Sequence, residues 1–97
     1  MIASFADRTT EALYHGGRGK AVKRIPPQIT AVAVRKLDML NSARVLQDLH
    51  QPPGNRLEAL RGELRGLYSI RINEQWRIVF RWSAGEAHEV RIVDYHR

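Results

Sequence analysis

The stretch from Leu67 to His96 alternates between two kinds of side chain along much of its length. One set of alternate positions is apolar: Tyr68, Ile70, Ile72, Trp76, Ile78, Phe80, Trp82, Val90 and Ile92. The other set, which we call the arginine face, is mostly basic: Ser69, Arg71, Arg77, Val79, Arg81 and Arg91. Neighbouring side chains of a strand point to opposite sides of a sheet, so this pattern is typical of an antiparallel sheet buried on one side. We therefore predict three strands here.

The same alternation predicts the length of the two turns. A three-residue connection, Asn73 to Gln75, sets Ile72 opposite Trp76, whereas a two-residue loop would set Ile72 opposite Arg77. A slip by one residue turns a buried face outward, so burial selects the odd loop. By the same reasoning we predict an odd-numbered loop around residues 83–85, because a two-residue turn there would place Phe80 opposite Glu89.

The first half of the chain carries the signals of helices. Pro26-Pro27 opens a predicted main helix that runs to Asn41, with Arg35, Lys36 and Asp38 off its apolar side. The apolar side of this helix consists of Ile29, Val32, Ala33, Leu37 and Leu40. We expect this side to pack on the sheet, and Ser42 to cap a further helical turn over residues 43–49.

Shorter elements flank the main helix. Ile2 to Phe5 fits an edge or added strand, and Asp7 or Thr9 fits the N-cap of a short helix that continues through Tyr14. The sequence thus predicts one α+β domain over residues 1–97. Its antiparallel sheet has about four or five strands, with the N-terminal helices packed on one face.

The charge balance narrows the class of partner. Sixteen Lys and Arg residues stand against ten Asp and Glu, which gives a net charge of +6. Such a surface attracts nucleic acid, ribosomal RNA or an acidic protein segment, although it can also serve solubility alone. The chain has no cysteine, and its four histidines lack metal-ligand spacing, so we expect neither a metal nor a cofactor. No apolar run reaches the ~20 residues of a membrane span, and we expect a cytoplasmic protein.

The arginine face favours an anionic ligand. Arg71, Arg77, Arg81 and Arg91 fall on adjacent strands, and Arg61 and Arg65 enter from the loop before them. Like charges opposite one another on a sheet are unfavourable unless something neutralises them. Glu89 can pair with some of these side chains, and long arginines can extend into water. A phosphate, which matches the planar fork of arginine, is the better explanation.

The triplet Asp94-Tyr95-His96, followed only by Arg97 in this sequence, has side chains that can take part in catalysis. A histidine titrates near neutral pH and can transfer a proton during phosphodiester cleavage, a carboxylate can orient it or accept a proton, and a tyrosine can stack on a base. Strict alternation puts Asp94 and His96 on one face and Tyr95 on the other. All three can line one site only if the strand twists or ends at about Val93.

Several motifs together resemble a known family. They are Leu57-Glu-Ala-Leu-Arg-Gly62, Gly66-Leu-Tyr-Ser-Ile70, Gln75-Trp-Arg-Ile-Val-Phe80 and Val93-Asp-Tyr-His96, with Met1-Ile-Ala-Ser-Phe5 at the start. In these motifs and in length the chain resembles the HigB (host inhibition of growth) branch of the RelE-like toxin superfamily, also called plasmid maintenance killer proteins. The resemblance implies the RelE-like fold and a metal-independent mRNA interferase that acts on mRNA in the ribosomal decoding site. It also implies a partner, a HigA-type antitoxin with a helix-turn-helix domain.

The resemblance also implies roles for individual residues. In this family the 2′-hydroxyl of the mRNA attacks the neighbouring phosphate and the 5′-oxygen leaves. Asp94, Tyr95 and His96 match the catalytic triplet, and Arg77 matches an arginine beside the scissile phosphate. Arg61 matches a basic position that is lysine in related toxins. By this reading Arg61, Arg65, Arg71, Arg81 and Arg91 contact RNA.

One position departs from some relatives, in which a catalytic histidine stands where this chain has Glu58. The general base is therefore Glu58, His96 or Asp94. Two alternatives to a ribonuclease follow from the same residues. The related ParE branch poisons DNA gyrase without being an enzyme, and a ribosome- or RNA-binding module would need the arginines but not the terminal triplet.

Overall fold

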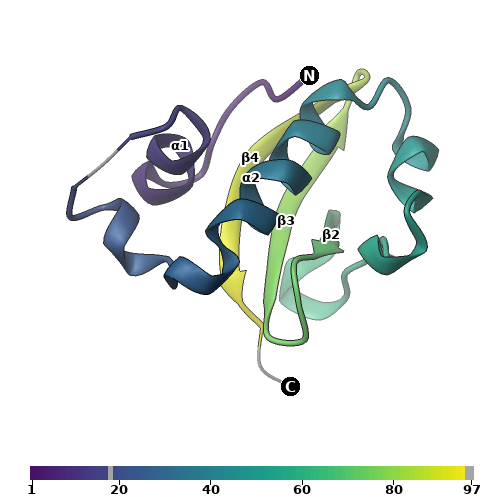
Figure 1. Ribbon diagram of the computed structural model, residues 1–97. Helices are drawn as coiled ribbons and strands as arrows, with labels where there is room; N and C mark the ends of the chain where they lie inside the picture. The colour runs from purple at the N-terminus through teal and green to yellow at the C-terminus, as the bar shows by residue number, and fades with distance from the viewer. Residues whose placement is uncertain (18, 96–97) are drawn as a thin grey trace.

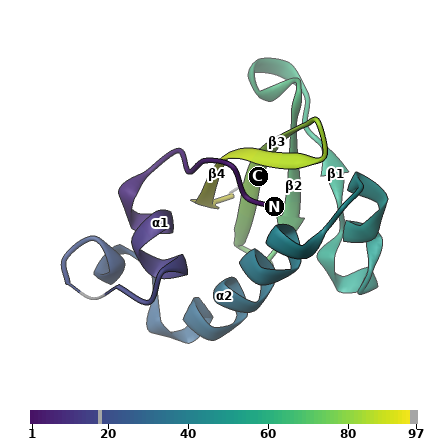
Figure 2. The same cartoon turned by 90° about the horizontal axis from the view of Figure 1, so that it is seen from above.

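The computed structural model describes residues 1–17 and 19–95, which form helices on one side of an antiparallel sheet (Figure 1). The helices are α1 (Arg8–Tyr14) and α2 (Pro27–Ser42), and the strands are β1 (Glu58–Ala59), β2 (Leu67–Arg71), β3 (Trp76–Ser83) and β4 (Glu86–Asp94). Short 3₁₀ turns cover Val22–Arg24, Leu46–His50, Pro53–Asn55 and Gly62–Leu64. In this part of the chain the strand order is β1-β2-β3-β4. Seen from above, α1 and α2 lie on the same side of the sheet (Figure 2), which confirms the predicted α+β class.

Local sequence signals set the ends of both helices. The Asp7 carboxylate accepts a hydrogen bond from the Thr10 N–H at 2.7 Å, so Asp7 is the N-cap of α1. α2 begins at Pro27, where a missing N–H costs nothing because the first turn has no partner for it. The helical turn expected over residues 43–49 is instead a 3₁₀ turn that begins at Leu46.

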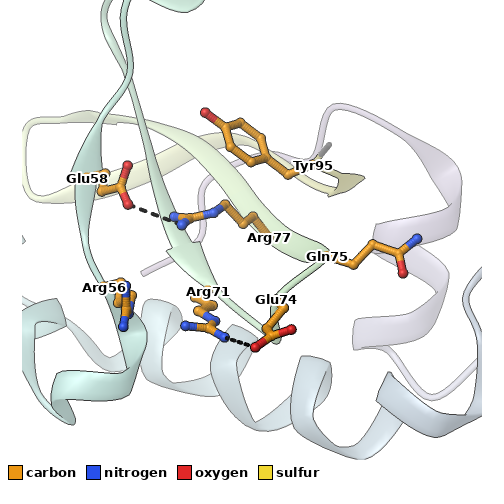
Figure 3. Close-up of a pocket in the computed structure, with 7 residues that line it drawn as sticks. All are labelled: Arg56, Glu58, Arg71, Glu74, Gln75, Arg77 and Tyr95. Atoms are coloured by element: carbon orange, nitrogen blue, oxygen red, sulfur yellow. Dashed lines mark hydrogen bonds and ion pairs between the residues drawn. The ribbon is translucent and has the colours of Figure 1, made fainter. Parts of the chain in front are cut away.

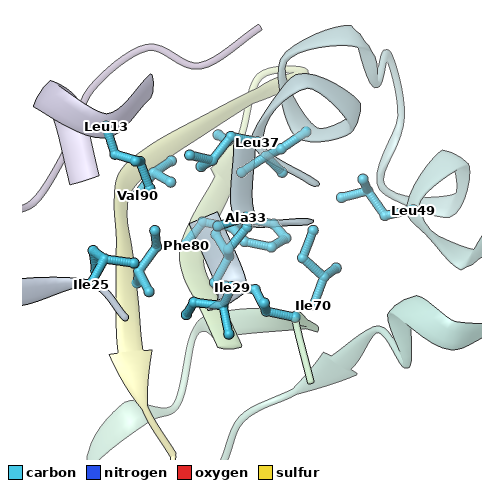
Figure 4. Packing of buried hydrophobic residues seen from close by; sticks show 14 of the residues in the cluster. Leu13, Ile25, Ile29, Ala33, Leu37, Leu49, Ile70, Phe80 and Val90 are labelled. Atoms are coloured by element: carbon cyan, nitrogen blue, oxygen red, sulfur yellow. The ribbon is translucent and has the colours of Figure 1, made fainter. Parts of the chain in front are cut away.

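The apolar face of the sheet is confirmed as the core. Phe80, Ile70, Ile78 and Val90 are fully buried, and the apolar side of α2 packs onto them (Figure 4). Trp76 and Trp82 pack against this cluster at its edge, as their position in the alternation predicts. The buried apolar residues of the cluster are Leu13, Ile25, Ile29, Ala33, Leu37, Leu40, Ala43, Leu49, Ile70, Ile72, Ile78, Phe80, Ala87, Val90 and Ile92.

Lys36 corrects the sequence prediction for α2. The sequence predicts that Lys36 lies off the apolar side of the helix and is exposed, yet Lys36 is only 7% exposed. Its ammonium donates a hydrogen bond to the Asn55 side-chain oxygen, and Asn55 is fully buried. This partner from a loop 19 residues away makes burial of a charged side chain tolerable. Burial lowers the pKa of Lys36, and the neighbouring Arg35 lowers it further.

The hairpin between β2 and β3 has the predicted register. Tyr68 pairs with Phe80, Ile70 with Ile78, and the Ile72 N–H donates to the Trp76 carbonyl at 2.9 Å. The connection is the three-residue segment 73–75. The Asn73 side-chain oxygen accepts hydrogen bonds from the N–H groups of Gln75 at 2.8 Å and Trp76 at 2.7 Å, and these bonds close the turn.

The prediction of an odd loop between β3 and β4 was wrong. Ser83 pairs with Glu86, so the turn is the two-residue Ala84-Gly85, and both residues have positive φ, at 53° and 77°. The register then shifts between Val79 and Arg81, where Glu89 (φ 54°) is the extra residue of a β-bulge. The bulge restores the alternation, so that Ile78 still pairs with Ile92 and Val90 is still buried.

The N-terminal segment adds to the free edge of β4. Ile2 bridges to Ala87 and Phe5 to Val90, both in parallel orientation, as expected for an added strand. The Ser4 hydroxyl accepts a hydrogen bond from the N–H of Glu89 at 2.8 Å, at the bulge. Among the described residues, no helix has the length and apolar character needed to cross a membrane.

Candidate active site on the arginine face

Arg77 is the centre of the arginine face. It lies on β3 and is 8% exposed, although its side chain points away from the helices. One guanidinium nitrogen (Nη1) donates to the Ser69 hydroxyl at 2.9 Å, and the other (Nη2) donates to the Glu58 carboxylate at 3.1 Å. Ser69 itself is fully buried. Two fixed partners therefore hold the guanidinium in one orientation, and its remaining N–H groups are left for a ligand.

β1 carries Glu58 to this position. β1 pairs with β2 so that Glu58 stands opposite Ser69, and two residues further along β2 Arg71 stands opposite Arg77 of β3. Glu58 and Arg77 thus lie on the same face with β2 between them, and Figure 3 shows the ion pair that joins them. The Glu58 side chain is 38% exposed, so its carboxylate faces both the arginine and the solvent.

Tyr95 covers the other side of Arg77. The guanidinium carbon lies 5.1 Å from the centre of the tyrosine ring, a cation–π distance. Tyr95 follows directly after β4, and the alternation places it on the arginine face, as predicted. Glu58, Arg77 and Tyr95 therefore converge, from three different segments of the chain (Figure 3).

The tip of the first hairpin fixes the end of β4. The Gln75 carbonyl accepts a hydrogen bond from the Tyr95 N–H at 2.6 Å, and the Gln75 side-chain amide donates to the Asp94 carboxylate at 3.0 Å. Asp94 stands opposite Trp76, on the opposite side of the strand from Tyr95. His96 lies outside the described residues. Gln75 is thus a connection between the hairpin and the terminal triplet that the sequence did not reveal.

Two adjoining hollows surround these side chains. The first has a volume of about 490 Å³ and is lined by Arg56, Glu58, Arg71, Glu74, Gln75, Arg77 and Tyr95 (Figure 3). The second, of about 550 Å³, is lined by Glu58, Ala59, Leu60, Arg61 and Tyr95. Since Glu58 and Tyr95 line both, Arg61 lies on the far side of them from Arg71. Sequence analysis overlooked Arg56, which precedes β1 and carries no motif.

The outer arginines differ in their partners. Arg71 lies 3.9 Å from the Glu74 carboxylate, and Arg81 donates to Glu89 at 2.8 Å. The hydrogen bond and charge of Arg81 lower the pKa of Glu89. Among the described residues, Arg61, Arg65 and Arg91 have no carboxylate within ion-pair distance. The predicted arginine face is thus present, but glutamate side chains of the same protein neutralise part of its charge.

This arrangement can stabilise a phosphate and move a proton. Arg77 offers fixed donors to the oxygens of a phosphate, where charge builds up when the phosphorus is attacked. Glu58, at 3.1 Å from Arg77, is placed to accept a proton from a nucleophile bound beside that phosphate. Within the described residues, no three His, Asp or Glu side chains gather as metal ligands.

Comparison with known proteins identifies the family. Residues 3–96 match the family described as HigB-like toxin, the RelE-like toxin of the type II toxin-antitoxin system HigB. This chain belongs to the HigB-like toxins. The toxin HigB-1 of Vibrio cholerae is 41% identical over 87 residues, which are 90% of each chain. A protein named endoribonuclease HigB, from Proteus vulgaris, is 27% identical over 96 residues, which are 99% of this chain and 100% of that protein.

Solved structures show that this HigB-like toxin has the RelE-like toxin fold. A mutant of YafQ from E. coli has a TM-score of 0.64 at 12% identity, covering 97% of this chain and 93% of that chain. The YoeB-YefM toxin-antitoxin complex from Staphylococcus aureus has a TM-score of 0.60 at 15% identity, covering 100% and 99%. At these identities the similarity concerns the fold alone.

Proposed function

We propose that this HigB-like toxin is a ribosome-dependent endoribonuclease that cleaves mRNA and so inhibits translation. The observation that carries the proposal is the convergence of Glu58, Arg77 and Tyr95 around hollows on a basic face. The endoribonuclease named among its relatives supports the same activity. A further part of the proposal is that a HigA-type antitoxin with a helix-turn-helix domain neutralises this chain.

The proposed reaction needs a base, an acid and a charge stabiliser. Glu58 removes the proton of the 2′-hydroxyl, whose oxygen attacks the adjacent phosphorus. The bond to the 5′-oxygen breaks, and a 2′,3′-cyclic phosphate remains. Arg77 binds the non-bridging oxygens, whose negative charge grows in the transition state.

The terminal triplet completes the proposed site. His96 protonates the leaving 5′-oxygen, since histidine is the side chain that most often serves as a general acid. Tyr95 stacks on a base of the mRNA, since one side of its ring packs on Arg77. The Asp94 carboxylate accepts a hydrogen bond from the Gln75 amide at 3.0 Å, and this bond keeps the end of β4 in place for the action of Tyr95 and His96. The ribosome contributes by aligning the mRNA, because in-line attack is largely a matter of positioning.

The test compares variants in a translation reaction, with primer extension to map cuts in ribosome-bound mRNA. Arg77→Ala should lower the cleavage rate by about 10²–10³-fold, the usual loss when one donor to a developing anion is removed. Arg77→Lys should recover little, because it keeps the charge but loses the fork. Arg35→Ala is the matched control, since Arg35 is exposed on α2.

Two results would contradict the proposal. Cleavage by a folded Arg77→Ala protein at the rate of the control would remove Arg77 from the mechanism. Inhibition of gyrase supercoiling while the mRNA stays intact would favour the ParE-like alternative instead.

A further inference from the structure

Arg56 has a left-handed backbone conformation at the end of the 3₁₀ turn Pro53–Asn55. Three described residues other than glycine have positive φ: Arg56 at 45°, Ala84 at 53° and Glu89 at 54°. The two-residue turn between β3 and β4 requires a positive φ at Ala84, and the bulge in β4 accounts for the positive φ of Glu89. Arg56 ends a 3₁₀ turn, a position where the left-handed conformation is common but is usually taken by glycine or asparagine. Glycine or asparagine would adopt this conformation at lower cost, and strained residues of this type concentrate at functional sites.

The residue before Arg56 fixes this conformation. The Asn55 side-chain amide donates to the carbonyls of Leu49 and Gln51 at 3.1 Å each, and its oxygen accepts from Lys36. The Arg56 N–H in turn donates to the Pro53 carbonyl at 3.2 Å. The loop is therefore anchored in the core directly before the exposed Arg56 side chain. The backbone at Arg56 is thus already fixed before a ligand binds.

Arg56 also continues a row of arginines across the sheet. Arg71 on β2 pairs with Arg77 on β3, and Arg56, in the loop before β1, lines the same hollow as Arg71. The row therefore runs from β3 across β2 to this loop. All three arginines line the hollow of about 490 Å³ (Figure 3).

The charges in this row are unevenly neutralised. Arg77 has Glu58 at 3.1 Å, but Arg71 has only Glu74 at 3.9 Å, and the Glu74 side chain is 95% exposed. Within the described part of the chain, Arg56 has no carboxylate within 4 Å. Adjacent like charges on a sheet repel each other unless an anion binds between them. Arg56 and Arg71 are therefore the less neutralised end of the row.

We propose that Arg56 and Arg71 form a second phosphate subsite, which binds the backbone phosphate next to the one held by Arg77. The hollow is as large as typical small-molecule pockets, about 300–1,000 Å³, so it has room for a nucleotide unit rather than one phosphate. The subsite sets the direction of the RNA strand, from Arg77 on β3 toward the loop before β1. This proposal rests on the proposed function, because it takes RNA as the ligand.

The first test separates RNA binding from stability. Arg56→Gly removes the guanidinium at a position whose backbone suits glycine, so its Tm should be unchanged or higher. Binding of a short single-stranded RNA is followed by fluorescence anisotropy over a range of salt concentrations. The slope of log K against log salt should fall in magnitude by about 0.7, the value for one lost phosphate contact with a single strand. Arg44→Ala, an exposed arginine between α2 and the next 3₁₀ turn, should keep the wild-type slope.

The second test locates the phosphate. Ribosome-bound mRNA carries one uncharged methylphosphonate linkage, placed on either side of the cleaved one in turn. At one of these two positions it should slow cleavage by the wild type by about ten- to a hundredfold, the effect of losing a hydrogen bond to a charged group. The same linkage should have a smaller effect on Arg56→Gly, in which only Arg71 is left to contact that phosphate. Asn is a second replacement that tolerates this backbone, and Arg56→Asn should behave as Arg56→Gly does.

Each outcome decides between the two proposals. A wild-type salt slope for Arg56→Gly, or a methylphosphonate effect that adds fully to that of the variant, would overturn the subsite and leave the ribonuclease proposal intact. If the wild type leaves ribosome-bound mRNA uncut, the ribonuclease proposal fails. The salt slope of RNA binding then still decides whether Arg56 contacts a phosphate.

Discussion

The two faces of the sheet bury their side chains for different reasons. On the helix-covered face, Ile70, Ile78 and Phe80 are fully buried because α2 packs on them. In the described part of the chain no helix covers the arginine face, yet Arg77 is only 8% exposed. There, burial comes from other polar and aromatic side chains, Glu58 and Tyr95, which close around a charge. The first face holds the fold together, and the second holds the Arg77 guanidinium in one orientation.

The difference predicts that the two faces respond separately to mutation. Residues on the covered face should affect stability, with any loss of activity following from unfolding. Residues around Arg77 should affect activity at nearly constant stability. The three predictions below test this separation, from the largest expected effect to the smallest.

The largest effect concerns Phe80. Phe80→Ala should lower the free energy of unfolding by about 3–5 kcal/mol, because the cavity cannot be refilled between α2 and the sheet. Denaturant unfolding measures this loss, and cleavage at a temperature where the variant stays folded should remain near the wild-type rate. A loss of less than about 1 kcal/mol would show that the covered face is not the main source of stability.

A smaller effect is expected from substitution of Gln75, which bonds to Asp94 and Tyr95 beside the arginine face. Gln75→Leu removes the amide that donates to Asp94, while the Gln75 carbonyl still accepts from Tyr95. Cleavage should fall about tenfold, the scale of one hydrogen bond to a charged group, through kcat rather than KM. Gln28→Leu, an exposed glutamine on α2, is the matched control. An equal loss in both variants, or a loss that tracks Tm, would assign Gln75 a structural role only.

The smallest effect concerns Glu89 at the edge of the arginine face. Its partner Arg81 lowers its pKa in the folded state, so the pair stabilises the protein above the ordinary carboxyl pKa of about 4.3. That contribution disappears as pH falls through the lower, folded-state pKa. The Tm of Glu89→Gln should therefore be slightly below that of the wild type at neutral pH and meet it in acid. High salt should reduce the difference, and a difference that is constant across pH would contradict the ion pair.

Sequence periodicity predicted the first hairpin and failed on the second for a physical reason. Between Ile72 and Trp76 the two strands keep a strict alternation, so only one loop length buries both. Between Trp82 and Val90 a bulge supplies the missing residue, and a two-residue turn with a bulge has the same parity as an odd loop. Alternation shows only that the turn and any bulge together contain an odd number of residues. It could not show that one of these residues is a bulge at Glu89.

The site was partly predictable. Arg77 and Tyr95 share the arginine face by alternation alone, and the resemblance to HigB toxins added Glu58. The contact between Glu58 and Arg77 depends on the pairing of the two-residue strand β1, which has too few residues to show a period. Lys36 was misplaced because its partner, Asn55, is far along the chain in a loop. Arg56 gave no signal, since a positive φ at arginine cannot be inferred from residue type.

The position of β4 late in the sequence determines when the N-terminal residues can make their contacts during synthesis. Ile2 and Phe5 bridge to β4, and the Thr10 hydroxyl accepts a hydrogen bond from the Ile92 N–H, a contact between residues 82 positions apart. Chains grow from the N-terminus, so the first ten residues have no strand to pair with until β4 has been synthesised. Contacts of such long sequence separation also form slowly. A chain that has not yet reached β4 lacks Tyr95 as well, so the fold and the proposed site are completed at the same stage of synthesis.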